Sequence, residues 1–515
     1  MIRSTIPVRR VFALGIFGVA TFAAAAPLLA QTAGYAARPS GFDLNFNGVV
    51  GEAGTADQNV CNGIGNETST TGKDIDGNGV ADRQVYVDLT GGSDNTACGL
   101  PGSPCRTIAY AMNGSNTDVV GGPIQNPAPA QIQALCFKGI GRETVVPTVS
   151  GAAGTYSLPQ AGRQSRSFNL PRYPFILSGW DANQNKQYPP YDAGDTALID
   201  CTLGGSASLP YAIDNTLNFV SNIEYAHFSV AHCGQMDRGS GGDTHEGFMN
   251  VCSQGQSCSQ IYVHDLNLAD IMKAEQNESY HEVFNMFTGS LTYFNVTNIN
   301  VTNVGGGYFA RGAGPPGTTV GPYRFQNISA TVFGFTDTNG SCPGTVGGAV
   351  ECTWSGFKLW DYLTGVEVID NDFNLNPSAW TPHAVGGAGS VFVTADYCVQ
   401  DWVIRGNKAT DFKQFVSVAP YYGSPGQCES RPVDGIVVDR NIFRNSYAAW
   451  QFGDWGIQIL PGKDTIDTAR NVTITNNFLS SVPGWEACVW ANGGNPVAPQ
   501  GGVVTVAEGR LSYGN

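Results

Sequence analysis

One pattern of apolar and polar positions recurs late in the chain. Two apolar residues separated by one position precede a two-residue break and an asparagine, and another apolar or small residue follows two positions later. The four asparagines of this pattern, which are 36, 34 and 36 residues apart, are Asn371, Asn407, Asn441 and Asn477. Alternating apolar residues predict a strand with one buried face, and the break predicts a corner. Repetition at this period predicts stacked coils of a parallel β-solenoid.

The same frame extends in both directions with other residues in the asparagine place. These further occurrences begin at Ile223, Ile261, Phe294, Tyr323 and Val504. Together the occurrences predict nine coils from about residue 217 onward, and strands ~4.8 Å apart would then build a rod of roughly 40 Å. Apolar pieces at residues 135–137, 175–177 and 197–199 predict earlier, looser coils.

The asparagine column has a physical explanation. Asparagine tolerates unusual backbone angles at a tight corner and bonds neighbouring backbone groups. Stacked amides also bond to one another along a rod. We therefore expect these asparagines to be structural and not part of a functional site.

Composition agrees with strands and turns. The 515 residues include 66 glycines, 13% are charged and 42% are hydrophobic, which is ample for a core. The net charge of −15 argues against nucleic acid as a partner. It leaves open a glycan bound at a local site, and an acidic surface also suits bound calcium.

Residues 1–30 are typical of a secretory signal peptide. A basic start with Arg3, Arg9 and Arg10 precedes an apolar run and small residues up to Ala30. The Arg9-Arg10 pair loosely resembles a twin-arginine signal, although the ordinary secretory route is favoured. We expect a secreted, extracellular or periplasmic protein, and no later run reaches the length of a transmembrane span.

Thirteen cysteines, all after residue 30, fit an oxidising compartment. Close spacing predicts local bonds, which pair Cys98 with Cys105, Cys252 with Cys258, Cys342 with Cys352, and Cys398 with Cys428. The connectivity of the remaining five cannot be read from the sequence, and the odd count leaves at least one thiol or an intermolecular bond. The chain has no Cys-x-x-Cys pair, so a structural zinc site is not indicated, although His232 adjoins Cys233.

Residues 85–112 carry a family resemblance. A strand at 86–88, a Gly/Ser/Asp loop at 91–94 and a Ser-Pro-x-x-Thr-Ile turn at 103–108 precede a short amphipathic helix. This arrangement resembles the opening of secreted right-handed parallel β-helix proteins of the pectate-lyase-like superfamily. The resemblance implies an all-β, single-stranded right-handed parallel β-helix over residues 85–515 with a short N-terminal capping helix. Because the superfamily contains lyases, hydrolases, adhesins and non-catalytic surface proteins, the fold does not settle the function.

The Gly/Asn/Asp-rich segment at residues 31–84 contains two calcium-type loops. Acidic and amide oxygens at alternate positions converge on Ca²⁺. The first loop comprises Asp74, Asp76, Asn78 and Asp82, and the second and weaker one comprises Asp43, Asn45 and Asn47. Val85 stands where the usual bidentate glutamate is expected. We expect a structural calcium ion, with ordinary asparagine- and aspartate-rich turns as the alternative.

Charged residues beside the asparagine column form one candidate site. Asp372 and Lys408 occupy equivalent places one coil apart, and Arg405 and Asp439 are stacked in the same way, with Arg440 beside them. A uronate-cleaving lyase requires a base and a cation for the carboxylate, so Lys408, Arg405 and Arg440 are the catalytic candidates. The alternative is a set of solvated ion pairs, each contributing little. The motifs of the polygalacturonase-type hydrolases are absent.

Other chemistry-bearing residues fall in loops. One insertion holds Lys273, Glu275, Glu278, His281 and Glu282, and Arg311 follows the next coil. Glutamate and histidine there are candidates for acid and base. His227 and Asp265 share a column and are expected to bond to each other. Trp450 and Trp455 are the candidates for stacking on sugar rings.

These observations favour a secreted, calcium-associated β-helix that acts on or binds polysaccharide, with a lyase-type enzyme as the leading hypothesis. The alternatives are a non-catalytic surface or matrix protein and an adhesin. The last predicted strand, at residues 503–506, has no obvious cap. An open strand edge favours end-to-end self-association.

Overall fold

The computed structural model describes the strands and the turns close to them. The described residues are 61, 71–73, 82–112, 133–149, 165–170, 175–179, 197–202, 209, 211–215, 221–234, 247–252, 257–271, 282–287, 289–302, 304, 308–315, 318, 320–331, 345–346, 349–350, 355–375, 391–412, 414–419, 433–445, 456–459, 471–481, 489–491, 504–506 and 511–513. No helix among them is long and apolar enough to cross a membrane.

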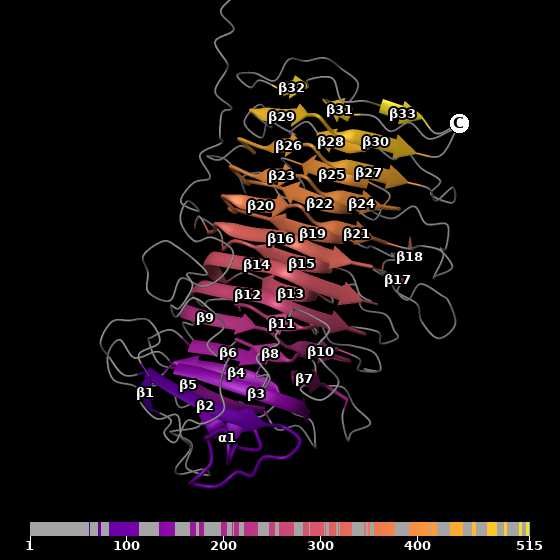
Figure 1. Ribbon diagram of the computed structural model, residues 1–515. Helices are drawn as coiled ribbons and strands as arrows, with labels where there is room; N and C mark the ends of the chain where they lie inside the picture. Colours follow the sequence, from indigo (N-terminus) through magenta and orange to yellow (C-terminus); the bar gives the residue numbers. More distant parts are fainter. Residues whose placement is uncertain are drawn as a thin grey trace, which may run out of the picture.

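The chain is a stack of parallel strands that rises from the N-terminal to the C-terminal end (Figure 1). The first strand of each coil belongs to one ladder, formed by β2 (Asp82–Asp88), β3 (Gln133–Gly141), β6 (Phe175–Gly179), β9 (Ser221–Ala226), β12 (Ser257–Ala269), β14 (Ser290–Thr302), β16 (Tyr323–Ala330), β20 (Val366–Ile369), β23 (Val403–Arg405), β26 (Val437–Asp439), β29 (Val472–Thr475) and β32 (Val504–Val506). The nine coils predicted from about residue 217 are confirmed, since β9 to β32 supply nine first strands.

Beyond the corner, a second run of strands continues the same sheet. Its members are β7 (Ala197–Asp200), β10 (Ser229–Ala231), β21 (Asp372–Asn374), β24 (Lys408–Thr410), β27 (Ile442–Asn445), β30 (Phe478–Ser481) and β33 (Leu511–Tyr513). Strands β12, β14 and β16 pass through the corner without interruption, because they pair with strands on both sides of it.

A second sheet closes the other side of the coils. It consists of β5 (Ser165–Leu170), β4 (Thr144–Val149), β8 (Ile213–Asp214), β11 (Met249–Asn250), β13 (Glu282–Phe287), β15 (Tyr308–Ala313), β19 (Ser355–Trp360), β22 (Val391–Asp396), β25 (Gln414–Ala419), β28 (Ile457–Ile459) and β31 (Val489–Ala491). A small hairpin, β17 (Thr345–Val346) with β18 (Ala349–Val350), lies apart from both sheets.

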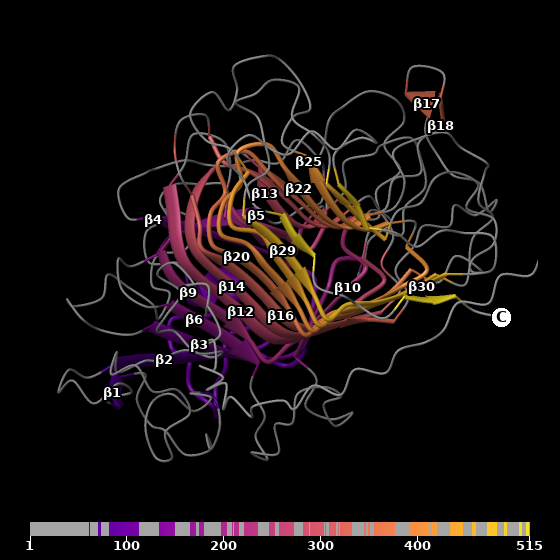
Figure 2. The same cartoon turned by 90° about the horizontal axis from the view of Figure 1, so that it is seen from above.

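The helix is right-handed. Figure 2 looks along the rod from its C-terminal end, with β20 at the left, β30 at the right and β22 toward the top. The chain visits these three positions in that order within each coil while it advances toward the viewer, which defines a right-handed turn. The fold is therefore the right-handed parallel β-helix expected from the sequence.

The residue just before the asparagine position of the repeat has a left-handed backbone, also in the coils where another residue takes that position. The equivalent residues, with φ between 52° and 68°, are His227, Asp265, Asn298, Asn327, Asp370, Gly406, Arg440 and Asn476. Most are asparagine, aspartate or glycine, the residue types that tolerate this region at least cost. Each coil therefore turns in the same way, which keeps the strands in register.

The four asparagines lie in a single buried file, as predicted. The side-chain nitrogens of Asn371, Asn407 and Asn441 each donate to the side-chain oxygen of the next asparagine, at 2.9, 3.0 and 2.8 Å. Each of these oxygens also accepts the backbone N–H of the preceding asparagine. The file therefore satisfies buried backbone groups at the corner, as its structural role requires.

The core is filled by aromatic and branched side chains from both sheets. Phe325, Phe357, Phe373 and Phe392 form a continuous series of ring contacts, with centroids 5.0 to 5.6 Å apart. Trp402 is fully buried.

The N-terminal end of the rod is covered. Helix α1 (Ile108–Met112) is the predicted capping helix, and it packs against β2, β3 and β5. The loop before it bonds to the edge of β2 that faces away from β3, where Cys105 donates its N–H to Tyr86 and accepts the N–H of Asp88. Strand β1 (Thr71–Lys73) pairs with β2 in the antiparallel sense.

The early coils differ in detail from expectation. The sequence pieces at 175–177 and 197–199 belong to one coil, because β3 pairs with β6 before its corner and with β7 beyond it.

Four disulfides join described cysteines. Two are the predicted local bonds, Cys98–Cys105 and Cys252–Cys258. The other two, Cys61–Cys136 and Cys201–Cys233, join residues whose pairing the sequence left open. Cys398 is also disulfide-bonded, whereas Cys342, Cys352, Cys428 and Cys488 lie outside the described residues. Such bonds are typical of proteins from oxidising compartments.

Candidate functional site

The predicted ion pairs beside the asparagine file are present. Lys408 Nζ lies 2.7 Å from Asp372 Oδ2, directly across the β21–β24 pair. Arg405 Nε and Arg440 Nε lie 3.2 and 2.9 Å from the same oxygen of Asp439. The residue beside Asn407 in the corner column is Gly406, so Arg405 stands one place earlier, in line with Asp439.

The surroundings of Asp439 keep its carboxyl group ionised. Partial burial raises the pKa of Asp439, but hydrogen bonds from Asn476, Thr475 and Arg440 outweigh it, and the pKa is lowered overall. Asp439 is therefore an anion that neutralises its arginines. Each catalytic candidate at this corner is engaged by a carboxylate, and its role in chemistry remains a prediction.

Several other predicted site residues fall outside the described part of the chain. They are Trp450, Trp455, Lys273, Glu275, Glu278, His281 and, for calcium, Asp43, Asn45, Asn47, Asp74, Asp76 and Asn78. Asp82 begins strand β2, and its side chain is not described. Calcium binding by these loops thus stays a prediction.

A group that the sequence did not reveal lies on the outer face of the second sheet. Arg311 on β15 and Lys358 on β19 are direct neighbours in the strand pairing. Tyr308 and Trp360 flank them: Arg311 Cζ is 5.4 and 5.3 Å from the two ring centroids, and Lys358 Nζ is 5.5 and 5.7 Å away. We call these four residues the cation–aromatic face.

Glu282 anchors one side of this face. Arg311 Nη1 donates to Glu282 Oε1 at 2.8 Å, and Glu282 is completely buried on β13, one coil earlier. A buried carboxylate of this kind fixes the guanidinium in place. Of the residues predicted in the insertion before residue 283, Glu282 is therefore the one that the structure joins to Arg311.

Lys358 differs from the other cations described so far. Among the residues that the structure describes, no carboxylate pairs with it, and its contacts are the two rings. Lys358 and Trp360 are half-buried, whereas Tyr308 and Arg311 on the neighbouring strand are buried. Arg311 and Lys358 thus place two cationic side chains side by side on an otherwise acidic protein. Such a face suits an anionic group attached to a ring that stacks on an aromatic side chain.

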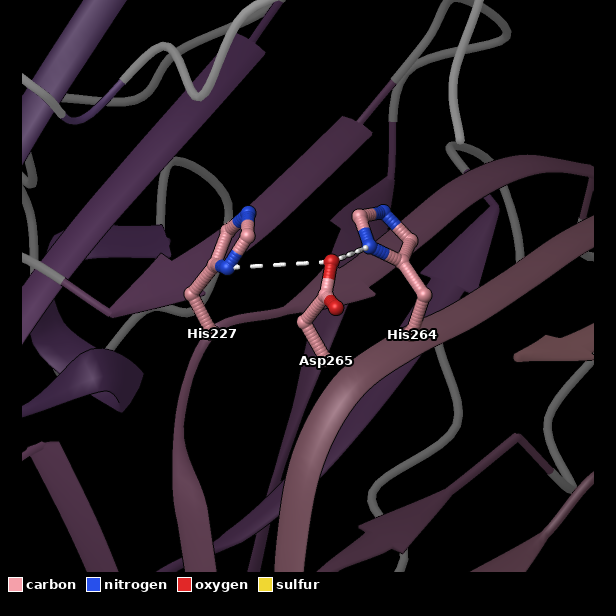
Figure 3. A group of neighbouring side chains, drawn as sticks. All are labelled: His227, His264 and Asp265. Atoms are coloured by element: carbon pink, nitrogen blue, oxygen red, sulfur yellow. Dashed lines mark hydrogen bonds and ion pairs between the residues drawn. The ribbon is translucent and has the colours of Figure 1, made fainter. Parts of the chain in front are cut away.

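A third group surrounds His264, at the first-sheet corner (Figure 3). His264 Nδ1 lies 2.8 Å from Asp265 Oδ2, and its Nε2 lies 2.9 Å from Glu224 Oε1. Burial alone lowers the pKa of His264, but hydrogen bonds to Asp265 and Glu224, together with their charges, outweigh burial and raise the pKa to about 10. His227 Nδ1 lies 3.9 Å from Asp265 Oδ2, so the predicted contact between these two residues is present as an ion-pair distance.

Comparison with known proteins gives structural likenesses only. No family model matches the chain, and no curated protein matches it. Among solved structures, a complex of XylC with xylose is 10% identical with a TM-score of 0.42, and the match covers 79% of this chain and 70% of that one. DFA-IIIase from Arthrobacter chlorophenolicus A6 with DFA-III is 12% identical, with a TM-score of 0.35 and coverage of 83% of both chains. The Yersinia enterocolitica family 28 exopolygalacturonase is 11% identical, with a TM-score of 0.21 and coverage of 84% of this chain and 80% of that one.

Proposed function

We propose that this protein acts outside the cytoplasm on an acidic polysaccharide built from uronic acid residues, which it binds at the cation–aromatic face. The observation that carries the proposal is the pairing of Arg311 with Lys358 between Tyr308 and Trp360. A uronate unit presents a carboxylate and an apolar ring face, and the four side chains supply a partner for each. The disulfides support a location outside the cytoplasm.

Charge supports a local site over general attraction. The whole chain carries a net charge of −15, which repels a polyanion at long range. Binding therefore requires cations gathered at one place, and the cation–aromatic face sets two of them side by side. Lys358 is the half-buried cation that reaches the ligand, and Arg311, held by Glu282, lies beside it in the strand pairing.

Elimination is the reaction that suits such a substrate. A base removes the proton at C5 of the uronate, the C4–O bond breaks, and a C4=C5 double bond forms while the leaving oxygen takes up a proton. Cations near the carboxylate stabilise the negative charge that develops at C5 and on the carboxylate. The new double bond absorbs in the ultraviolet, so turnover is visible directly.

The test compares two lysines on different sheets. Binding to alginate, polygalacturonate and a glycosaminoglycan is measured by affinity electrophoresis, with a neutral glucan as the reference polymer. We expect Lys358→Ala and Trp360→Ala each to weaken binding of one acidic polymer about tenfold, a loss of about 1.4 kcal/mol. Lys408→Ala is the matched control and should leave binding unchanged.

Ultraviolet absorbance on the same polymers tests elimination. Loss of turnover in Lys358→Ala, with turnover retained in Lys408→Ala, would place the reaction at the cation–aromatic face. Loss of turnover in Lys408→Ala alone would instead place it at the corner that holds Arg405 and Arg440. Wild-type protein that binds none of the three acidic polymers contradicts the proposal.

A non-catalytic carbohydrate-binding or surface protein is the second candidate. The ion pairs that occupy Lys408, Arg405 and Arg440 favour it, because each candidate base or cation at the corner already has a carboxylate partner. Binding of an acidic polymer by the wild-type protein without any rise in ultraviolet absorbance identifies this case.

A further inference from the structure

We propose that His227, His264 and Asp265 form a binding site for a divalent transition metal ion, with Zn²⁺ as the best match. One ligand atom from each residue lies within 4.8 Å of the other two. Figure 3 shows Asp265 between the two imidazole rings, with its carboxylate directed to both. This site is distinct from the cation–aromatic face and from the calcium-type loops, so it goes beyond the proposed function.

The distances suit tetrahedral coordination. Asp265 Oδ2 lies 2.8 Å from His264 Nδ1 and 3.9 Å from His227 Nδ1. Zinc bonded at about 2.0–2.1 Å places neighbouring tetrahedral ligands about 3.3 Å apart, between these two values. Small rotations of the side chains therefore suffice, and the fourth position is left for water.

Backbone geometry explains why the ligands meet. His227 and Asp265 occupy the same corner position in consecutive coils, with φ of 60° and 52°. A Cβ at Gly179, one coil earlier, would collide with the carbonyl oxygen of His227, so glycine there lets the backbone of this coil pack closely. His264 directly precedes Asp265, and its ring meets that of His227 edge-on with centroids 5.4 Å apart.

The surrounding hydrogen bonds direct the ligand atoms toward one point. Glu224 Oε1 accepts from His264 Nε2 at 2.9 Å, which leaves Nδ1 as the atom for the metal. Asn298 donates to Asp265 Oδ1 at 3.1 Å, and Asn327 donates to Asn298 at 2.7 Å, which leaves Oδ2 of Asp265 for the metal. Metal-bound histidines usually donate their second nitrogen to a carboxylate, and metal-bound carboxylates are themselves hydrogen-bonded.

A purely structural role accounts for part of this arrangement. Without a metal, a doubly protonated His264 bonds to Asp265 and Glu224 at once. His227 adds a second imidazole nitrogen, 3.9 Å from the same carboxylate oxygen, and two imidazoles with one carboxylate are a donor set that Zn²⁺ prefers. A metal ion takes the place of the proton on Nδ1 and uses both histidines.

The decisive experiment uses the whole protein purified without a polyhistidine tag and dialysed against a chelator. Zn²⁺ is added in competition with a chromophoric chelator, and Co²⁺ is added separately to record its visible spectrum. We expect one tightly bound Zn²⁺ per chain, the intense visible bands of tetrahedral Co²⁺, and a rise in Tm of about 2–4 °C with excess Zn²⁺.

Two variants remove a ligand without disturbing the corner. His227→Asn is compatible with the backbone, because Asn298, Asn327 and Asn476 occupy the same corner position in other coils. Asp265→Asn keeps the side-chain shape. Each should weaken Zn²⁺ binding at least tenfold and abolish the cobalt bands, while the wild-type fold persists by circular dichroism.

His232→Asn is the control. His232 also has a left-handed backbone, with φ of 59°, and also contacts carboxylates, at 3.0 Å from Asp200 and 3.6 Å from Asp270. It should bind Zn²⁺ as the wild type does. The proposal is overturned if the wild type retains no Zn²⁺, or if His227→Asn retains as much as the wild type.

Discussion

At the scale of single residues, Asp361 is the carboxylate least suited to its surroundings. It follows Trp360 at the end of β19 in a left-handed conformation, with φ of 52°, and its buried Oδ1 has no hydrogen bond from the described residues. Burial raises its pKa from 3.8 to about 6. Between these values the folded chain binds more protons than the unfolded chain, so stability falls as pH rises through this window.

We therefore predict that Asp361→Asn stabilises the protein at neutral pH. Asparagine removes the charge and tolerates the same backbone conformation. Because the carboxyl group is partly exposed, the expected gain is only about 1 kcal/mol near pH 7, and it should vanish near pH 4, where the carboxyl is already neutral. Urea unfolding at both pH values measures the difference, and an equal effect at both would contradict this account.

Sequence reasoning found site residues where the repeat fixes their position. The contact of His227 with Asp265 was predicted because both stand in the frame that the asparagines define. The role of His264 and Glu224 was not, because nothing in the pattern tells which outward residues of adjacent coils will pair. Lys358 was not predicted for another reason. No single residue type marks a fixed position along the strands of its sheet, and loops of variable length separate these strands from the asparagine repeat.

At the scale of elements, the fold could be predicted because the stacked asparagines mark the same position in successive coils and so reveal how the strands align. Asn407 shows how: it accepts the N–H and side-chain N–H of Asn371, and it donates to the carbonyl of Val368 at 2.7 Å and to Asn441 at 3.0 Å. Removing such a side chain leaves several buried groups without partners. The early coils were less predictable, since β6 and β7 carry no such marker.

We predict that Asn407→Ala lowers the free energy of unfolding by about 3 kcal/mol, since the buried partners lose their hydrogen bonds. Asn267→Ala is the matched comparison, because Asn267 accepts from Asn300 at 3.2 Å in a half-buried pair on the outer surface. Its loss should cost less than about 1 kcal/mol. Chemical denaturation of both variants gives the values, and similar losses would show that the inner file has no special role.

At the scale of the whole molecule, the two ends of the rod differ. The first coil is covered by α1 and by the loop that bonds to the edge of β2. At the other end β32 and β33 pair with β29 and β30 on one side, and within the described residues no strand pairs with their outer side. An unpaired strand edge is a template for another strand, and we predict association through the C-terminal coil.

Sedimentation velocity tests this association. We expect the sedimentation coefficient of the wild type to rise over about a hundredfold increase in concentration, because strands added at the open edge form new backbone hydrogen bonds. A lysine on an edge strand opposes such pairing, so Thr505→Lys should keep the protein monomeric over the same range. Thr473→Lys is the control, since Thr473 lies opposite Thr505 but within the stack, where β29 pairs on both sides. If the wild type stays monomeric throughout, the open edge does not drive assembly, and the C-terminal end must be protected by the chain itself.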